Sequence, residues 1–381
     1  MKRMLLFTLA LVLLSAVFAG NAILAANPVT LNIATAGDTN MEELQRLHVA
    51  PLIAQKYPYL KLNVVGTGPG DDGSRKIFDK LKAQKDAGMK TYDIDVAIVH
   101  QGIMSELLKE GLLTKYVKMT NVAKFVIGDS AKNSLGANVD GYVIPLFQSQ
   151  TAIAYDSQKV KKVPQTIDEL EAWIKANPNQ FGYNGVKNGM SGVAMVTAYV
   201  YAKTGDYKQL SKGPYDPKLE TKWTAILKQL KSLPVTYTNG NQGTLDQLNR
   251  GEIAMGPVWV DMFYSDVANG RMNPNIKLKL LGPGMPGQPM YIVIPAKAAH
   301  RADAVKFAQF LASPETQAKV IVDQYNWYPG IDPTAVLPKS SPAAKSGLFK
   351  DITPNDLNRF SQVFMLAQYK TDLLDAFENI R

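Results

Sequence analysis

The sequence has 381 residues, of which 46% are hydrophobic, and a formal net charge of +9 at pH 7. This length exceeds what one ordinary hydrophobic core supports and predicts two lobes. The basic residues are scattered beside acidic ones along helical stretches, and they form no stripe of the kind that nucleic-acid binding requires.

Residues 1–26 have the pattern of a cleaved secretory signal peptide. Two basic residues precede an apolar run that is shorter than the roughly 20 residues of a membrane span, and small residues follow it. Cleavage is expected after Ala26, with Ala22 and Ala25 as alternatives, and a retained N-terminal anchor is a further alternative. Because the chain has no cysteine for a disulfide or a lipid anchor, we expect it free in the periplasm of a Gram-negative bacterium.

The first part of the mature chain alternates predicted strands and helices. Residues 31–35, 60–65 and 92–99 have the apolar and β-branched patterns of strands. One helix is predicted from Met41, and another over 74–87. This order is typical of a parallel α/β sheet.

Two later segments have the features of connections between lobes. Residues 142–155 are extended, and Pro145 within them favours an edge strand or a crossing. The run 282–289 is rich in glycine and proline, which is typical of a linker. We therefore predict crossings near 145–155 and 285–295, with a hinge between two lobes.

These crossings define the predicted domains. The first lobe comprises residues 27–150 and a return segment, 289–330, and the second lobe comprises residues 151–288. Each lobe is expected to hold a mostly parallel sheet flanked by helices. Residues 331–381 are predicted to form C-terminal helices that pack across the lobes.

Helix starts in the later part of the chain are marked by local signals. Thr166 and Glu169 have the spacing of a capping box. Ser313 followed by Pro314 predicts an N-cap with proline in the first helical position. Residues 223–230 have the apolar spacing of an amphipathic helix.

A glycine-rich loop is predicted at residues 66–73, and within it Gly68 to Gly73 match the G-x-G-x-x-G pattern of dinucleotide-binding loops. Asp71 and Asp72 would lie where a pyrophosphate binds and would repel it, and Pro69 removes a backbone donor. We interpret this segment as a plain loop at the rim of a pocket.

The sequence offers little catalytic chemistry. The three histidines, His48, His100 and His300, have no metal-ligand spacing, and no nucleophile or metalloprotease motif is present. His100 follows a predicted strand, which is where α/β proteins bind ligands. Ser191 is the one candidate nucleophile for a secreted hydrolase, although no histidine is obviously placed to serve it.

Three short segments are candidate binding elements. Asn188 and Ser191 lie at a predicted helix start, whose free N–H groups bind polar groups, and a flexible loop is the alternative. Trp259 and Asp261 are two residues apart, hence on one side of an extended chain, and suit a cationic or sugar-like ligand. A buried structural tryptophan with a capping aspartate is the alternative. An aromatic cluster that ends a helix includes Trp327, and packing between lobes is its alternative.

Four segments across the chain resemble family 1 extracellular solute-binding proteins, which include the polyamine, thiamine, ferric-iron and sugar receptors of bacterial ABC importers. Ile167 stands where the family often has tryptophan, which affects packing. A tyrosine pair of the iron-receptor type is not evident, because two residues separate Tyr325 from Tyr328. The four segments are 50–58 with 60–65, 143–155 with 163–170, 250–256, and 299–317.

The resemblance implies a type II periplasmic binding protein fold, in which loops of two lobes meet a ligand in the cleft. No catalytic residue, metal or cofactor is implied. The ligand contacts implied in this chain are Asp38, Thr39, Asn40, Gly68, His100, Gln101, Gln148, Ser149, Asn188, Ser191, Trp259, Asp261, Trp327 and Tyr328.

The predicted function is that of a monomeric receptor, not an enzyme, which closes on a small polar solute and delivers it to an ABC permease. The acidic and aromatic candidates favour an organic cation such as a polyamine or a thiamine-like compound, a sugar is also compatible, and the basic net charge mildly favours an anion. A secreted hydrolase and a periplasmic interaction protein without a transport role are the alternatives.

Overall fold

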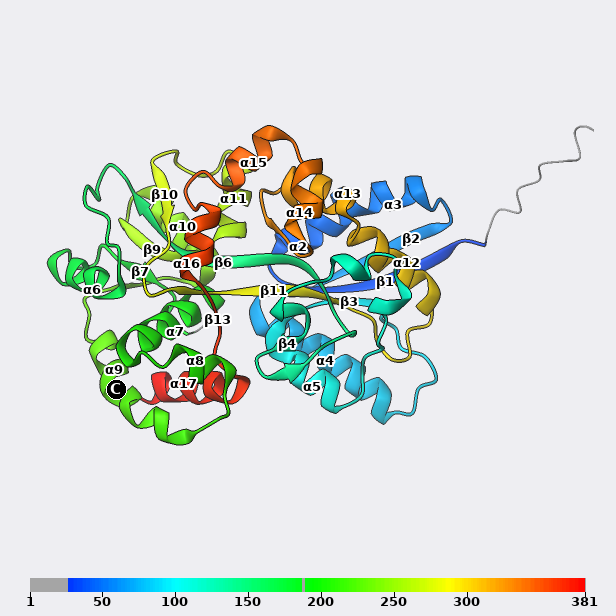
Figure 1. Cartoon of the computed structure of the whole chain (residues 1–381), viewed down its shortest axis with the longest axis horizontal. Coiled ribbons are helices and arrows are strands. Elements are labelled where there is room, and N and C mark those ends of the chain that lie inside the picture. Colours follow the sequence, from blue (N-terminus) through cyan, green and yellow to red (C-terminus); the bar gives the residue numbers. More distant parts are fainter. Residues whose placement is uncertain (1–26, 187–188, 381) are drawn as a thin grey trace, which may run out of the picture.

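The computed structural model describes residues 27–186 and 189–380 (Figure 1). The predicted signal peptide and Asn188 therefore lie outside the described residues. The strands are β1 (Val29–Ala36), β2 (Leu60–Gly68), β3 (Val96–His100), β4 (Asn133–Ser134), β5 (Ala137–Asn138), β6 (Ile144–Asp156), β7 (Gly182–Tyr183), β8 (Thr236–Tyr237), β9 (Met255–Trp259), β10 (Ile276–Lys279), β11 (Met285–Val293), β12 (Tyr328–Pro329) and β13 (Ser361–Val363).

The helices cover the faces of the sheet in two groups, one on each lobe. The π-helical segments η1 (Leu44–Val49) and η7 (Gln317–Val322) continue α2 and α13 without a break. The α-helices are α2 (Thr39–Glu43), α3 (Ala50–Lys56), α4 (Gly70–Asp86), α5 (Met104–Lys109), α6 (Ile167–Ala176), α7 (Met190–Thr204), α8 (Tyr207–Lys212), α9 (Trp223–Lys231), α10 (Gly240–Arg250), α11 (Val260–Ala268), α12 (Arg301–Leu311), α13 (Pro314–Thr316), α14 (Pro333–Val336), α15 (Pro342–Leu348), α16 (Pro354–Phe360) and α17 (Ala367–Asn379).

The first lobe is built on the strand order β2-β1-β3-β11-β6. β1 pairs in parallel with both β2 and β3, as the alternating strands and helices predicted, and every residue of β3 is buried. β3 begins at Val96 rather than at Tyr92, because Tyr92 instead bridges to Ala298. The α/β fold predicted for this lobe is confirmed.

β6 and β11 connect the two lobes and pair antiparallel with each other. Along β6, Gln150 is the last residue that pairs with β11, and Thr151 is the first that pairs with β9. The strand thus passes from one lobe to the other, and its pairing strand changes from β11 to β9 at that point. The predicted lobe boundary after residue 150 stays a proposal, and this change of partner supports it.

The strands of the second lobe pair in both antiparallel and parallel fashion. β6 runs antiparallel to β9 and β10, whereas β7 and β8 pair in parallel. Helices α6, α7, α9 and α10 surround these strands (Figure 1).

The linker predicted at residues 282–289 is wrong from residue 285 onward. These residues belong to β11, all of whose residues are buried. Gly287 shows why glycine occurs in this segment, because a Cβ at this position would lie 2.6 Å from the carbonyl oxygen of Ser149 on β6. Glycine therefore permits close strand contact at the hinge instead of chain flexibility.

The glycine-rich loop predicted at residues 66–73 is also wrong in extent. β2 continues to Gly68 and α4 begins at Gly70, so Asp71 lies in the first helical turn, where the helix dipole favours an acid. A Cβ on Gly73 would lie 2.0 Å from the carbonyl oxygen of Gly68. The glycine spacing thus serves a tight strand-to-helix connection.

The predicted helix caps are present with one change of partner. The Thr166 hydroxyl accepts from the Glu169 N–H at 3.1 Å, but the Glu169 carboxylate accepts from the Gln165 N–H instead of that of Thr166. Ser313 accepts from the Thr316 N–H at 3.3 Å. These local bonds place α6 and α13 as the sequence predicted.

The C-terminal segment contacts both lobes. The Leu366 N–H donates to the carbonyl of Leu210 in the second lobe, and the Ala367 N–H donates to that of Leu135 beside the β4–β5 hairpin. α17 then packs against α9. Within residues 27–186 and 189–380, every helix is too short or too polar to cross a membrane.

Candidate functional site

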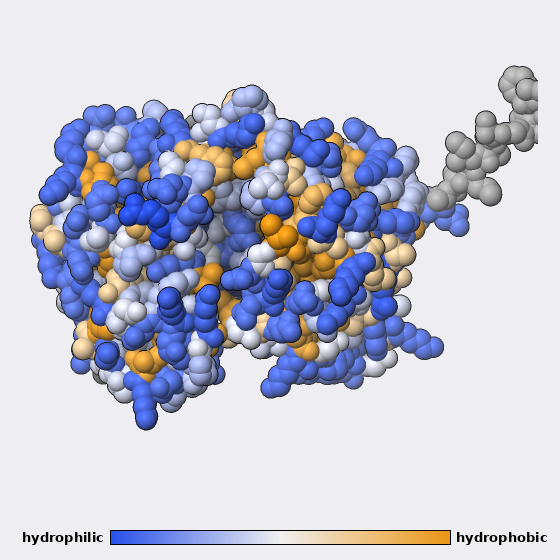
Figure 2. All heavy atoms as spheres, in the orientation of Figure 1, coloured by the Kyte–Doolittle hydropathy of each residue, from blue (hydrophilic) through white to orange (hydrophobic). Residues whose placement is uncertain are grey.

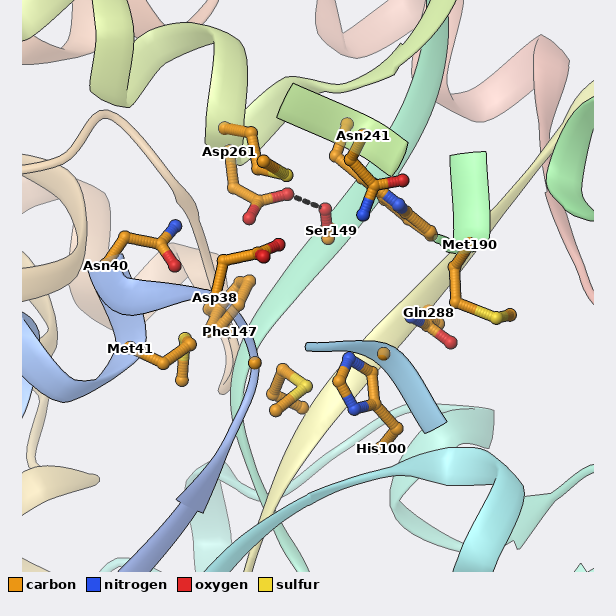
Figure 3. Close-up of a pocket in the computed structure, with 15 residues that line it drawn as sticks. Asp38, Asn40, Met41, His100, Phe147, Ser149, Met190, Asn241, Asp261 and Gln288 are labelled. Carbon is orange, nitrogen blue, oxygen red and sulfur yellow. Dashed lines mark hydrogen bonds between the residues drawn. The ribbon is translucent and has the colours of Figure 1, made fainter. Parts of the chain in front are cut away.

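A small cavity lies between the lobes, close to the crossing strands, and Figure 2 shows the surface notched between them. Its volume is about 40 Å³, which leaves room for on the order of three water molecules. The lining residues are Gly37, Asp38, Asn40, Met41, Gly70, His100, Phe147, Ser149, Met190, Asn241, Trp259, Asp261, Met262, Gln288 and Met290 (Figure 3).

Asp38 brings a carboxylate to the cavity from the first lobe. It follows β1 as the N-cap of α2, but its side chain makes no capping hydrogen bond and is free to face the cavity. Burial raises the pKa of Asp38, and the Asn241 amide beside it acts in the opposite direction. Asn241 belongs to α10, so this contact joins the two lobes.

Asp261 brings a second carboxylate from the other side. The extended geometry predicted for Trp259 and Asp261 is wrong, because β9 ends at Trp259 and Asp261 lies in the first turn of α11. Burial raises the pKa of Asp261 to about 6, the Ser149 hydroxyl that donates to it lowers the pKa, and the charge of Asp38 raises it further. The two carboxylates are thus close enough for their charges to interact (Figure 3).

No basic side chain of the described residues compensates these acids. Among residues 27–186 and 189–380, the lining of the cavity contains neither lysine nor arginine. In the part of the chain that the structure describes, Asp38 and Asp261 form no ion pair, although the sequence as a whole carries a net charge of +9. The centre of the cleft is therefore acidic in a basic protein.

The remaining wall of the cavity is mostly apolar and polarisable. Trp259 is 5% exposed, and Phe147 lies on β6 with its ring centroid 4.5 Å from that of Trp327. Four methionines complete this wall, and such thioether side chains adapt to ligands of different shape. They are Met41, Met190, Met262 and Met290.

His100 and Gln288 contribute polar side chains that are not carboxylates. His100 ends β3, its backbone N–H donates to the Ser74 hydroxyl at 2.9 Å, and burial lowers the pKa of its imidazole. The buried side-chain oxygen of Gln288 has no hydrogen-bond partner among the described residues. Gln288 can therefore accept a hydrogen bond in the cleft.

Thirteen of the fourteen sequence-predicted contacts lie in the described part of the chain, and the structure separates them into two groups. Those that line the cavity are Asp38, Asn40, His100, Ser149, Trp259 and Asp261. Those that do not are Thr39, Gly68, Gln101, Gln148, Ser191, Trp327 and Tyr328.

The aromatic cluster forms a layer behind the cavity. The Trp327 Nε1–H donates to the backbone carbonyl of Asp261 at 2.8 Å. Tyr328 pairs with Gln148 in the β12–β6 ladder, and the Gln148 amide donates to the Ser130 hydroxyl, away from the cavity. Trp327 therefore positions α11. This contact agrees with the alternative interpretation of the aromatic cluster, in which its residues pack between the lobes.

Ser191 has a positioning role. It is fully buried, and its hydroxyl donates to the side-chain oxygens of Asn241 and Asn184 at 2.8 and 3.1 Å. These amides are not bases, so the hydroxyl lacks the partner that a nucleophilic serine needs. Ser191 orients Asn241, which lines the cavity in its place.

The other predicted contacts are displaced by local geometry. The Thr39 side chain is exposed on the first turn of α2. Gly68 ends β2, and its carbonyl accepts from the Gly37 N–H at 2.9 Å. Gln101 is buried in a short 3₁₀ turn after His100.

Nine lining residues are not among the fourteen contacts that the sequence analysis names. Gly37, Met41, Gly70, Phe147, Met190 and Met262 lie within a few residues of predicted contacts, so extension of those loops would have found them. Asn241, Gln288 and Met290 lie on α10 and β11, where no motif pointed to a site. Within residues 27–186 and 189–380, no group of three or more histidine, aspartate or glutamate side chains could hold a metal ion.

The family is decided by a match of residues 70–350 to the model of the bacterial extracellular solute-binding proteins. The chain belongs to this family. Its members are described as extracellular bacterial proteins that bind solutes, which is a binding role and not a catalytic one. A sequence comparison with curated proteins finds no match.

Solved structures share the fold of this solute-binding protein. The spermidine/putrescine-binding protein of Streptococcus pneumoniae is 15% identical, with a TM-score of 0.64 over 92% of this chain and 98% of that one. An α-D-tagatose-bound protein of Thermotoga lettingae is 18% identical (TM-score 0.67, 91% and 92%). The apo ferric ion-binding protein of Pasteurella haemolytica is 14% identical (TM-score 0.65, 92% and 97%). The shared fold thus accommodates different solutes.

Proposed function

We propose that this protein captures a small polar solute between its lobes in the periplasm and delivers it to the permease of an ABC importer. The observation that carries the proposal is a cavity lined from both lobes, by Asp38 and Asn40 on one side and Asn241 and Asp261 on the other. A solute that contacts both lobes binds the closed conformation better than an open one, and so selects closure.

The size of the cavity supports a closing motion. The space of about 40 Å³ holds only a few water molecules, and we infer that the lobes move apart to admit an organic solute. β6 and β11 are the connections about which the lobes would turn. We place the hinge where β6 exchanges β11 for β9, between Gln150 and Thr151.

Closure and delivery can be measured separately. A metabolite panel is screened by thermal shift on the protein starting at Asn27, and a compound that raises the melting temperature is examined by small-angle scattering. The radius of gyration is expected to change at saturating ligand, and deletion of the gene is expected to abolish uptake of that compound. Absence of a thermal shift across all solute classes would argue against a receptor, and retained uptake would argue against delivery.

A further inference from the structure

We propose that the solute is a small organic cation whose ammonium group binds between Asp38 and Asp261. This inference rests on the proposed function and names the chemical class of its ligand. The two carboxylates approach the cavity from different lobes, one from the start of α2 and one from the start of α11 (Figure 3). A cation held by both would join the lobes.

The charges of the cavity favour a ligand with a positive charge. The carboxylate of Asp261 is buried and that of Asp38 is partly buried. The two charges repel each other, and each acid loses hydration without an ion-pair partner among the described residues. A cation removes both penalties when it binds, whereas an anion increases them. The basic net charge of the whole chain does not change this, because exposed charges beyond about 10 Å are screened by salt.

The hydrogen-bonding groups of the cleft match an ammonium. Ser149 donates to one oxygen of Asp261, and the cavity also presents the buried, unpartnered oxygen of Gln288. An ammonium carries three donors and no acceptor, so the carboxylates of Asp38 and Asp261 can each accept one of its hydrogen bonds, and Gln288 offers an acceptor in another part of the cavity (Figure 3). Gln288 lies on the crossing strand β11 and is independent of the two acids.

The apolar part of the lining distinguishes an organic amine from a sugar or a hard metal ion. Trp259 lines the cavity with an aromatic side chain of the type that binds cations, and the methionines offer contact to methylene groups. A sugar requires polar partners around most of its ring, and Ca²⁺ or Mg²⁺ requires about six oxygen ligands. The four methionines of the lining supply no such groups, whereas an amine with an apolar stem can contact both them and the acids.

The test uses calorimetry on the protein starting at Asn27 with matched probes. The cations are alkylamines and α,ω-diamines of two to six carbons and choline, the neutral isosteres are the corresponding alcohols and diols, and glucose, succinate, CaCl₂ and MgCl₂ complete the panel. We expect binding by at least one amine and none by its hydroxyl isostere. Loss of one charge-assisted hydrogen bond in Asp38→Asn or Asp261→Asn should weaken that binding roughly tenfold to 200-fold.

Asp266→Asn is the matched control, because Asp266 lies on the same helix, is equally buried and is paired with Arg271 outside the cavity. It should change amine affinity less than about twofold. Glucose or a diol that binds equally well to the wild type and to Asp261→Asn would overturn the cation inference and leave the receptor function standing. Calcium or magnesium binding that requires both acids, without amine binding, would overturn it too. Failure of every solute class would overturn both proposals.

Discussion

Two carboxylates near the cleft have opposite environments. Asp261, at its centre, faces Asp38 and no described cation, and its pKa is raised to about 6. Asp71, at the start of α4 in the first lobe, forms an ion pair with Lys370 of α17, which packs on the second lobe. Burial acts to raise the pKa of Asp71 as well, but Lys370, His100 and Arg75 together more than offset it, and the pKa lies below its usual value.

The difference between these sites separates a structural contact from a binding site. The Asp71–Lys370 pair joins the lobes with the protein's own charges and needs no ligand. At the centre, the same type of contact is incomplete, because both lobes contribute an acid. The cleft thus combines a contact that favours closure with a repulsion that a bound cation would remove.

The largest expected effect is a gain of stability in Asp261→Asn. The folded-state pKa of Asp261 is raised from 3.8 to about 6, so stability is lost as pH rises through that window. One pKa unit corresponds to about 1.4 kcal/mol, so removal of the charge should add up to about 3 kcal/mol to the free energy of unfolding at pH 8 and almost nothing at pH 3.5. Urea unfolding at both pH values measures this. A loss of stability at pH 8 would contradict the assignment of Asp261 as an uncompensated acid.

The Asp71→Asn substitution should have the opposite effect and lower the free energy of unfolding. It leaves the Lys370 ammonium, whose side chain is 9% exposed, without its partner, while the Asp71 side chain is 39% exposed and partly screened by water. We expect a loss of about 1–2 kcal/mol in urea unfolding at pH 7 and a larger radius of gyration without ligand. The loss should disappear as pH falls below the usual pKa of aspartate.

Asp72→Asn provides the control for this variant, since Asp72 is an exposed acid in the same helical turn. It should stay within about 0.5 kcal/mol of the wild type. Equal effects of the Asp71 and Asp72 variants would show that the helix dipole, and not the ion pair across the lobes, explains the stability.

The smallest effect expected is the pH dependence of amine affinity. An ammonium needs an ionised Asp261, and at pH 5 about nine tenths of a carboxyl with a pKa of about 6 is protonated. Affinity should therefore fall about tenfold between pH 8 and pH 5, as measured by calorimetry. The Asp261→Asn variant should bind the amine weakly, and its affinity should depend less on pH. If the affinity of the wild type is the same at pH 5 and pH 8, the ligand does not bind to this carboxylate.

Much of the fold was predictable because its signals are local. The buried strand β3, the amphipathic helix α9 and the caps of α6 and α13 each follow from residues within one or two turns. Local signals misplaced some ends of elements, as at Gly70, where a helix begins four residues earlier than predicted, and they mistook the start of β11 for a linker. Asp38 and Asp261 were also among the contacts that the family resemblance implied, and the structure places both in the cavity lining.

The composition of the sequence by itself determined a two-lobed α/β chain, and motif order indicated its family. Only the tertiary structure decided which side chains meet. Asn241 and Gln288 reach the cavity from α10 and β11, and Lys370 meets Asp71 across 299 positions of the chain. Helical and strand periodicities repeat every 3.6 and 2 residues and carry no information on partners at such separation. Those contacts follow from the order of strands across the hinge and from where each strand ends.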